Sequence, residues 1–163
     1  MPSASRLFFG SHPRRALARV AILIVFSYAL FHWVLIPVRT DGISMEPTYA
    51  SGRLNLVNRL SYRTRPPARG DIVAIRLAGL HVLYLKRIIA LPGERIAIVD
   101  GQVEVDGAPL IEPYVQHRRP WQLPEVQLGP AEYFVVGDNR GMNAVDHTFG
   151  RVDAFRIVGR VVF

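Results

Sequence analysis

A serine at position 44 and a lysine at position 86 are the two side chains of this chain whose types and surroundings fit nucleophilic catalysis. Serine is a weak nucleophile until a neighbouring base removes its proton. Lys86 is the only lysine among 20 lysine and arginine residues. Arginine cannot be deprotonated in a protein, whereas a desolvated lysine can. A chain that uses lysine only once therefore indicates a position that needs an amine able to lose its proton.

The histidines are the competing bases, and none of them lies at a spacing familiar from catalytic triads. Two of the five, His12 and His32, lie in the N-terminal region, which leaves His81, His117 and His147. The chain has no cysteine, which excludes disulfides, thiol catalysis and cysteine-based metal sites. We expect no metal ion and no other cofactor.

The surroundings of Lys86 fit the role of a general base. Residues 81–90 (HVLYLKRIIA) predict a β-strand, and strand alternation places Val82, Tyr84 and Ile88 on the face of Lys86. A lysine on a strand is usually a solvated edge residue, but these neighbours favour burial. Burial disfavours the ammonium and lowers its pKa by up to roughly 3–5 units. A lysine tuned to about pH 7–8 can take the proton of a serine hydroxyl.

An apolar run precedes Ser44 and predicts a membrane anchor. Val20–Val38 contains 19 residues with no formal charge when His32 is neutral. As an α-helix it would rise roughly 28 Å, which matches the hydrocarbon core of a bilayer. A cleaved signal peptide would have an apolar region of only about 7–15 residues, followed by a small-x-small site. Residues 36–44 contain no such site, so we expect a retained signal-anchor helix over residues 20–38.

Charge is concentrated before this helix. Residues 1–38 carry four arginines and no acid, and thus more than half of the net charge of +7. The basic excess therefore belongs largely to a tail, residues 1–19, and not to a basic stripe of the kind that nucleic-acid binders show. The positive-inside rule places this tail in the cytoplasm and residues 39–163 on the other side of the membrane. We expect contact with membrane lipid and no nucleic-acid partner.

The region after Ser44 has the alternating pattern of β-strands and no long helical period. Asp100-Gly101, between two short alternating segments, predicts a hairpin with a type I′ turn. The segment 112–125 contains three prolines and is expected to be irregular. The predicted strands cover residues 53–58, 71–77, 81–90, 96–99, 102–105, 132–136 and 155–163. We predict a mainly β fold, a compact antiparallel sandwich or barrel-like catalytic domain over residues 39–163, with one N-terminal transmembrane helix.

Four short motifs give a family resemblance. In chain order they are Ser44-Met45-Glu46-Pro47-Thr48, then Arg69-Gly70-Asp71, then Tyr84-Leu85-Lys86-Arg87 with Leu91-Pro92-Gly93-Glu94, then Gly137-Asp138-Asn139-Arg140. Their order and spacing resemble those of type I signal peptidases, the bacterial leader peptidases with a Ser-Lys dyad. The resemblance covers roughly residues 20–160, and an ordered set of four motifs is far more specific than any one of them.

The resemblance implies a membrane-bound serine endopeptidase that removes signal peptides from exported precursors at the outer membrane–water interface. Ser44 would attack the scissile carbonyl, and Lys86 would take its proton and later activate the deacylating water. The backbone N–H of Ser44 and a second donor would bind the oxyanion. Many relatives have a serine two residues before the nucleophile as that donor, where this chain has Gly42, so we expect a backbone or water substitute. Met45 would line the substrate pocket, although methionine is more often core filler, and Pro47 would fix the chain after the nucleophile.

The last motif supplies the expected supporting residues. Arg87 and Asp138 would form an ion pair behind the lysine, with Asn139 and Arg140 as further supporting residues. Relatives commonly continue with a serine that contacts the lysine. This chain has Asn143 at that position, and the carbonyl of its amide can still orient an amine.

The same resemblance implies where the enzyme works. It would be a single-pass protein of the bacterial cytoplasmic (inner) membrane, with its N-terminus in the cytoplasm and its catalytic domain on the outer, periplasmic side. Its partners would be precursor proteins with signal peptides, which carry small residues, often alanine, at the first and third positions before the cut and bind extended against a strand edge. The six residues from Val38 to Ser44 span at most about 20 Å, so the nucleophile would act at the membrane surface.

The last motif also leaves alternatives open, because Asp146 and His147 are one residue out of step with the usual pair. A Ser-Lys autoprotease of the LexA repressor class uses a related dyad, but the apolar anchor and the absence of a DNA-binding helical domain oppose it. A peptidase dedicated to one pilus or conjugation precursor fits the small size and the altered motif. A membrane-tethered scaffold or binding module that has lost catalysis is opposed by the presence of Ser44 and Lys86.

Overall fold

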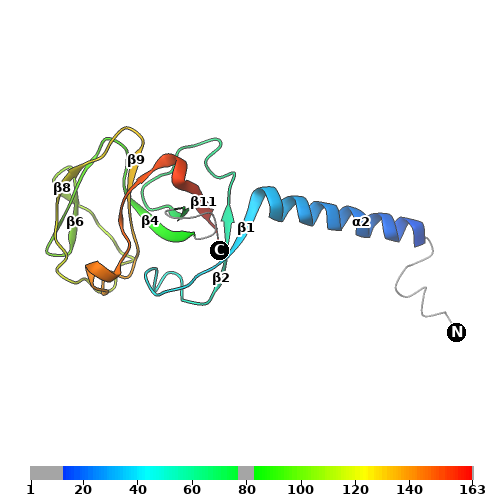
Figure 1. The fold of residues 1–163 in the computed structure, drawn as a ribbon, viewed down its shortest axis with the longest axis horizontal. Coiled ribbons are helices and arrows are strands. Elements are labelled where there is room, and N and C mark those ends of the chain that lie inside the picture. The colour runs from blue at the N-terminus through cyan, green and yellow to red at the C-terminus, as the bar shows by residue number, and fades with distance from the viewer. Residues whose placement is uncertain (1–12, 77–82, 163) are drawn as a thin grey trace.

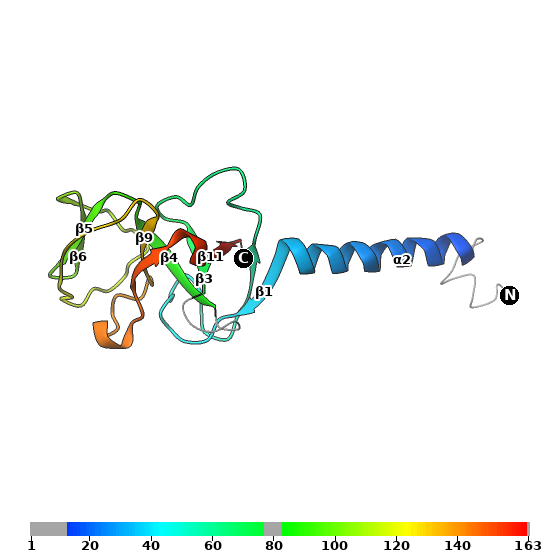
Figure 2. The same cartoon turned by 45° about the horizontal axis from the view of Figure 1, so that its top comes forward.

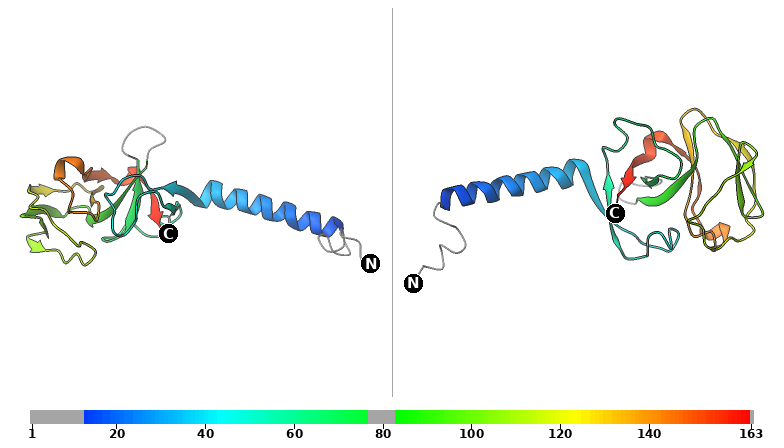
Figure 3. Two further views of the ribbon diagram at one scale, coloured as in Figure 1. Left: turned by 90° about the horizontal axis from the view of Figure 1, so that it is seen from below. Right: turned by 180° about the vertical axis from the view of Figure 1, so that it is seen from behind.

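The computed structural model describes residues 13–76 and 83–162. An α-helix, α2 (Pro13–Ala29), continues into a short π-helix, η1 (Leu30–Val34), and projects as a rod from a domain made of β-strands (Figures 1 and 3). Many side chains along the rod are apolar and exposed. Arg14–Val34 is long and apolar enough to cross a membrane, which would cover an apolar surface that water does not favour.

The apolar helix has other bounds than those predicted. The prediction was residues 20–38, but the helix already begins at Pro13 and the rod ends at Val34. Proline is favoured in the first turn of a helix, which explains the early start. The residues after Val34 form a strand, β1 (Leu35–Arg39), at the edge of a sheet. Pro37 cannot continue a helix but is tolerated in an edge strand, so this part of the apolar run joins the domain and not the anchor.

Some predictions fall outside the described residues. They concern the first 12 residues of the predicted tail, positions 77, 81, 82 and 163 of three predicted strands, and with them His12, His81 and Val82. The remaining seven residues of the predicted tail, 13–19, belong to α2 and are not a separate tail.

Within the described residues, the larger of two β-sheets has seven strands, and its neighbouring strands pair antiparallel. In spatial order they are β1, β2 (Leu54–Asn58), β11 (Ile157–Val161), β3 (Ile72–Ile75), β4 (Tyr84–Ala90), β9 (Glu132–Val136) and β10 (Gly150–Asp153). The last strand of the chain thus lies between β2 and β3, close to the base of the rod (Figure 2). β4, which carries Lys86, is paired on both sides and lies inside the sheet.

The smaller sheet has four strands and lies at the end of the molecule away from the rod (Figure 1). In spatial order they are β7 (Ala108–Pro109), β6 (Gln102–Val105), β5 (Arg95–Val99) and β8 (Leu123–Gln127). Asp100 and Gly101 have φ angles of 49° and 79°. A type I′ turn requires positive φ at both central positions, so the predicted hairpin is confirmed.

The sequence pattern missed several short elements. β8 starts inside the segment 112–125 that was expected to be irregular, and β7 and β10 were not predicted. Where one or two strands were expected over residues 155–163, a 3-10 helix, η3 (Ala154–Arg156), precedes β11. A second 3-10 helix, η2 (Ala144–Asp146), precedes β10. These elements are too short to show a period of their own.

Buried apolar clusters hold the sheets together and fix the region of Ser44. One cluster joins Phe134 and Val136 of the larger sheet to strands β5 and β6 of the smaller sheet. Another packs Met45 against residues of β2, β3, β4 and β11. Because Met45 is 1 % exposed, the backbone of the preceding residue, Ser44, is held against the sheet. The prediction of a mainly β fold with one N-terminal apolar helix is confirmed.

Candidate active site

Ser44 lies in a turn that follows β1 and is held by the last motif of the chain. The backbone N–H of Asn139 donates to the carbonyl of Ser44 at 3.1 Å. The side-chain amide of Asn139 donates to the carbonyl of Ile43, also at 3.1 Å. Asn139 thus binds two successive carbonyl groups, those of Ile43 and Ser44. These two hydrogen bonds fix the backbone at Ser44.

Lys86 reaches this serine from the middle of β4. Its Nζ lies 2.9 Å from Oγ of Ser44, although the two residues are 42 positions apart in the chain. The lysine is 2 % exposed, so the burial expected from strand alternation is confirmed. Burial lowers the pKa of Lys86 to about 8, and the charge of Asp138 opposes this shift only in part. A substantial fraction of the amine is therefore neutral in mildly alkaline solution.

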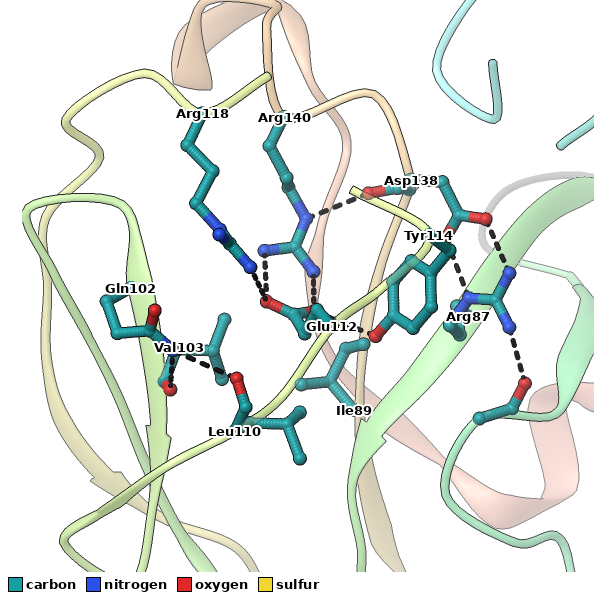
Figure 4. Close-up of polar contacts among 12 residues, drawn as sticks. Arg87, Ile89, Gln102, Val103, Leu110, Glu112, Tyr114, Arg118, Asp138 and Arg140 are labelled. Atoms are coloured by element: carbon teal, nitrogen blue, oxygen red, sulfur yellow. Dashed lines mark hydrogen bonds and ion pairs between the residues drawn. The ribbon is translucent and has the colours of Figure 1, made fainter. Parts of the chain in front are cut away.

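The predicted ion pair between Arg87 and Asp138 is present and is bidentate. Nε of Arg87 lies 2.8 Å from Oδ1 of Asp138, and Nη2 lies 2.5 Å from Oδ2 (Figure 4). Arg87 also donates to the carbonyl of Gly70 at 2.9 Å, and the hydroxyl of Thr48 donates to Oδ2 of Asp138 at 2.5 Å. One residue from each of the four sequence motifs therefore meets at this pair, directly beside Lys86 in the chain.

Arg140, another predicted supporting residue, forms a second buried ion pair. It is 1 % exposed, and its Nη2 lies 2.5 Å from Oε1 of Glu112. Its Nε donates to the carbonyl of Gly137 at 3.0 Å. Arg118 approaches the same carboxylate at 3.9 Å (Figure 4). The pair fixes the backbone of the last motif at Gly137.

Glu112 and Tyr114 are residues of the site region that the sequence pattern missed. The phenol of Tyr114 donates to Oε1 of Glu112 at 2.8 Å. Its ring lies 3.9 Å from the guanidinium carbon of Arg87, in the geometry of a cation–π contact. Burial and then the charge of Glu112 raise the pKa of Tyr114, which keeps the phenol a donor. Both residues lie in an aperiodic segment, so no local signal marked them.

A cavity of about 260 Å³ opens beside Ser44. Its walls come from the end of β1, the turn of Ser44 and the start of β4, and consist of Val38, Arg39, Thr40, Asp41, Ser44, Met45, Leu83, Tyr84 and Leu85. Met45 is packed in the core and also borders this cavity.

Gly42 and Pro47 flank Ser44 at the surface. The N–H of Gly42 donates to Oγ of Ser51 at 3.2 Å, so this N–H is occupied. Gly42 has a φ of 94°, which a residue with a side chain rarely adopts. Pro47 borders a separate groove of about 410 Å³ that is also lined by Asn139 and His117.

Asn143 does not lie where the sequence placed it. The expectation was contact with the lysine, but Asn143 is exposed and its amide donates to Oδ2 of Asp146 at 3.0 Å. The turn through η2 carries both side chains to the surface. His147, whose role the sequence left open, is instead buried at 4 % exposure. Among the described residues, no group of three or more histidines and acids is arranged to hold a metal ion.

The fold and the site together define the class of protein. It has a β-sheet domain on an apolar helical rod, and in that domain a serine hydroxyl lies against a buried lysine amine. The family model described as "Signal peptidase, peptidase S26" matches residues 14–163. The chain therefore belongs to this family, and the resemblance drawn from the four motifs is confirmed.

Two sequence relatives agree with this assignment. The chain is 37 % identical over 161 residues to "Signal peptidase I" of Bacillus caldolyticus, covering 88 % of this chain and 85 % of that protein. It is 32 % identical over 150 residues to "Probable signal peptidase I-1" of a Synechocystis strain, covering 87 % and 76 %. The crystal structure of a signal peptidase I from Enterococcus faecalis V583 matches with a TM-score of 0.47 and 25 % identity, over 60 % of this chain and 98 % of that one.

We predict that Glu112→Ala lowers the free energy of unfolding by about 3–5 kcal/mol, because it leaves the buried Arg140 without its anion. Glu125→Ala is the matched control, since Glu125 pairs with Arg95 at 3.4 Å on the exposed surface, where a pair contributes about 0–1 kcal/mol. Denaturant unfolding of both variants in detergent measures the difference. An equal, small loss in the two variants would contradict the structural role assigned to the buried pair.

Proposed function

We propose that this chain is a membrane-anchored serine endopeptidase that removes signal peptides from exported precursors, with Ser44 as the nucleophile and Lys86 as the general base. The observation that carries the proposal is the 2.9 Å contact between Nζ of Lys86 and Oγ of Ser44 in a chain of the signal peptidase family. The chain would have an anchor ending near Val34 and an extracytoplasmic peptidase domain after it.

The reaction follows from the properties of this pair. The neutral amine of Lys86 takes the hydroxyl proton of Ser44 while Oγ attacks the scissile carbonyl carbon. The resulting ammonium gives this proton to the leaving amine as the peptide bond breaks, and the signal peptide remains as an ester on Oγ. The amine, neutral again, removes a proton from a water molecule that attacks the ester. The ester bond breaks, Ser44 regains its proton and the signal peptide leaves as a free acid.

The oxyanion of each tetrahedral intermediate needs hydrogen-bond donors. The backbone N–H of Ser44 is the first donor we assign. The N–H of Gly42 already binds Oγ of Ser51, so it can act only if that bond opens. Because the N–H of Gly42 is occupied, the second donor that we expect is a water molecule or another backbone N–H.

The cavity beside Ser44 fits the substrate class of the family. Its apolar wall, from Val38, Met45, Leu83 and Leu85, suits a small apolar side chain such as the alanine that precedes the cut. β1 lies at the edge of its sheet and leads into this wall. An extended peptide can add to such an edge through main-chain hydrogen bonds, which would present its carbonyl to Ser44.

The anchor supports a location at a bacterial cytoplasmic membrane. Arginines lie at the start of the apolar span, at Arg14, Arg15 and Arg19, and the positive-inside rule then puts the N-terminus in the cytoplasm and the domain on the outer side. Ser44 lies ten residues beyond Val34, the end of the span. The nucleophile would work near the membrane surface, where it would contact lipid and the polar end of a signal peptide.

The proposal is tested with the full chain in detergent or vesicles and a precursor that carries an Ala-x-Ala site. We expect the wild type to cut after this site and Ser44→Ala to leave the precursor intact, because the nucleophile is absent. Mass spectrometry of the products locates the cut. Cleavage of only a pilin-like precursor would indicate the dedicated peptidase, and no cleavage of any precursor would indicate a scaffold.

We predict that Lys86→Arg abolishes cleavage although it keeps the positive charge, because arginine cannot serve as the base. The loss should be at least about 100-fold, the usual contribution of general base catalysis. The rate constant kcat for the same precursor measures the effect. Substantial activity in Lys86→Arg would instead assign the base to a histidine.

We predict that kcat/KM rises about tenfold per pH unit at low pH and levels off above a pH of about 8, where Lys86 loses its proton. The sign follows from the burial that lowers the pKa of the amine, since only the neutral form can accept the proton of Ser44. Initial rates between pH 5 and 10 measure the profile. A rate that levels off near the ordinary histidine pKa of about 6.5 would contradict this assignment.

A further inference from the structure

His147 is a buried titratable residue that the proposed reaction does not use. Its side chain is 4 % exposed. Among the described residues, its two ring nitrogens are the only buried side-chain polar atoms without a hydrogen-bond partner. A buried polar group without a partner is costly and rare in folded proteins, so its position needs an explanation.

The imidazole lies against the backbone of the nucleophile. A Cβ placed on Gly137 would collide with the carbonyl oxygen of Ser44 and would lie 2.6 Å from Nε2 of His147. The ring edge and the Ser44 carbonyl thus share the space that a side chain at Gly137 would occupy. This close approach explains why glycine is required at Gly137.

The same space lies next to the lysine. Arg87 of β4 pairs with Val136 of β9, and the next positions on the two strands are Lys86 and Gly137. Directly opposite residues of an antiparallel pair have their side chains about 5 Å apart on one face. Because Gly137 has no side chain, the space opposite Lys86 at the end of β9 is open to His147. His147 therefore faces the side chain of Lys86.

The ring is held in place and kept neutral by its surroundings. It packs edge-on against Trp121, with ring centroids 5.0 Å apart, and against Phe149 at 6.0 Å. Burial lowers the pKa of His147 to about 4, and the cations of Lys86 and Arg140 act in the same direction. The backbone carbonyls of Ser44 and Thr148 lie near enough to the ring to oppose this shift, although neither makes a hydrogen bond of good geometry with it. A neutral imidazole has one nitrogen that accepts a hydrogen bond.

The Lys86 amine needs such an acceptor. Among the described residues, Nζ of Lys86 has one hydrogen-bond partner, Oγ of Ser44. As a base the amine must aim its lone pair at the serine hydroxyl, which leaves two N–H donors to be oriented. We propose that His147 is a positioning residue for Lys86, its neutral ring accepting a hydrogen bond from the amine through one bridging water and so aiming the lone pair at Ser44. This inference rests on the proposed function of the Ser44–Lys86 pair.

The proposal is tested first without any substrate. Because Lys86 is the only lysine, ¹³C-labelled lysine in the full chain in detergent micelles gives one side-chain NMR signal that titrates with this amine. We expect His147→Leu to lower the pKa of Lys86 by about one unit, because the ammonium loses an acceptor. His147→Gln supplies an amide oxygen and should keep the pKa near that of the wild type.

The matched control is Val145→Ala, which changes a side chain that is 93 % exposed in the same turn and should leave the titration unchanged. With a precursor as substrate, we expect His147→Leu to lower kcat by about tenfold at little change in KM. His147→Gln should restore most of this loss. A packing role predicts the reverse order, since leucine suits the apolar pocket of Trp121 and Phe149 better than glutamine does.

An unchanged Lys86 titration and an unchanged kcat in His147→Leu would overturn the proposal. Loss of activity in both variants in step with their thermal stability, with the wild-type titration retained, would overturn it as well. The NMR titration does not depend on catalysis. A wild type that cuts no precursor therefore refutes the peptidase function, whereas the response of Lys86 to His147 is still read from the titration.

Discussion

Lys86 keeps its amine almost fully out of water, 2.9 Å from the hydroxyl of Ser44, and the rest of the site is arranged around this burial. An amine in such a place is usually held charged by a neighbouring carboxylate. Here the nearby carboxylate, Asp138, is engaged by Arg87 and by Thr48. Its charge is largely compensated, so it raises the pKa of Lys86 less than burial lowers it. Arg87 thus allows the lysine to stay close to an acid and still titrate near pH 8.

The same ion pair is linked to the irregular segment between β7 and β8. The guanidinium of Arg87 lies over the ring of Tyr114, whose phenol binds Glu112, which in turn pairs with Arg140 (Figure 4). Buried pairs of this kind add little net stability, but removing one partner is strongly destabilising. Each pair restricts where its partners can lie, because a buried charge must stay beside its counter-charge. The network thereby holds the last motif, with Gly137 and Asp138 in it, at the distance from β4 that the serine and the lysine require.

The parts of this site that could be predicted from the sequence are those with local or compositional signals. The Asp100-Gly101 hairpin follows from turn chemistry, and the single lysine in an apolar strand indicated a buried amine. Long-range partners have no such signal, which is why Glu112 in an aperiodic segment was missed. Asn143 was misplaced because alignment to a motif gives the order of residues and not the direction of a turn, and η2 turns this side chain outward.

The end of the anchor could not be located by hydropathy, since an apolar run that leaves a membrane and one that enters a sheet look alike. The structure divides it at Val34, and β1 follows without a linker.

This direct junction has a consequence for the proposed reaction. Arg59, just beyond β2, donates its backbone N–H to the carbonyl of Val34 at 2.9 Å and its side chain to the carbonyl of His32 at 3.3 Å. The base of the rod is therefore bound to the sheet by side-chain and main-chain contacts as well as by the chain itself. A flexible linker would let the domain sample many heights above a membrane. With β1 leading from the rod into the turn of Ser44, the proposed nucleophile is held at a set distance from the rod. A precursor whose own apolar helix lies in the same bilayer as the rod would then meet Ser44 at one depth, which would help to select the bond that is cut.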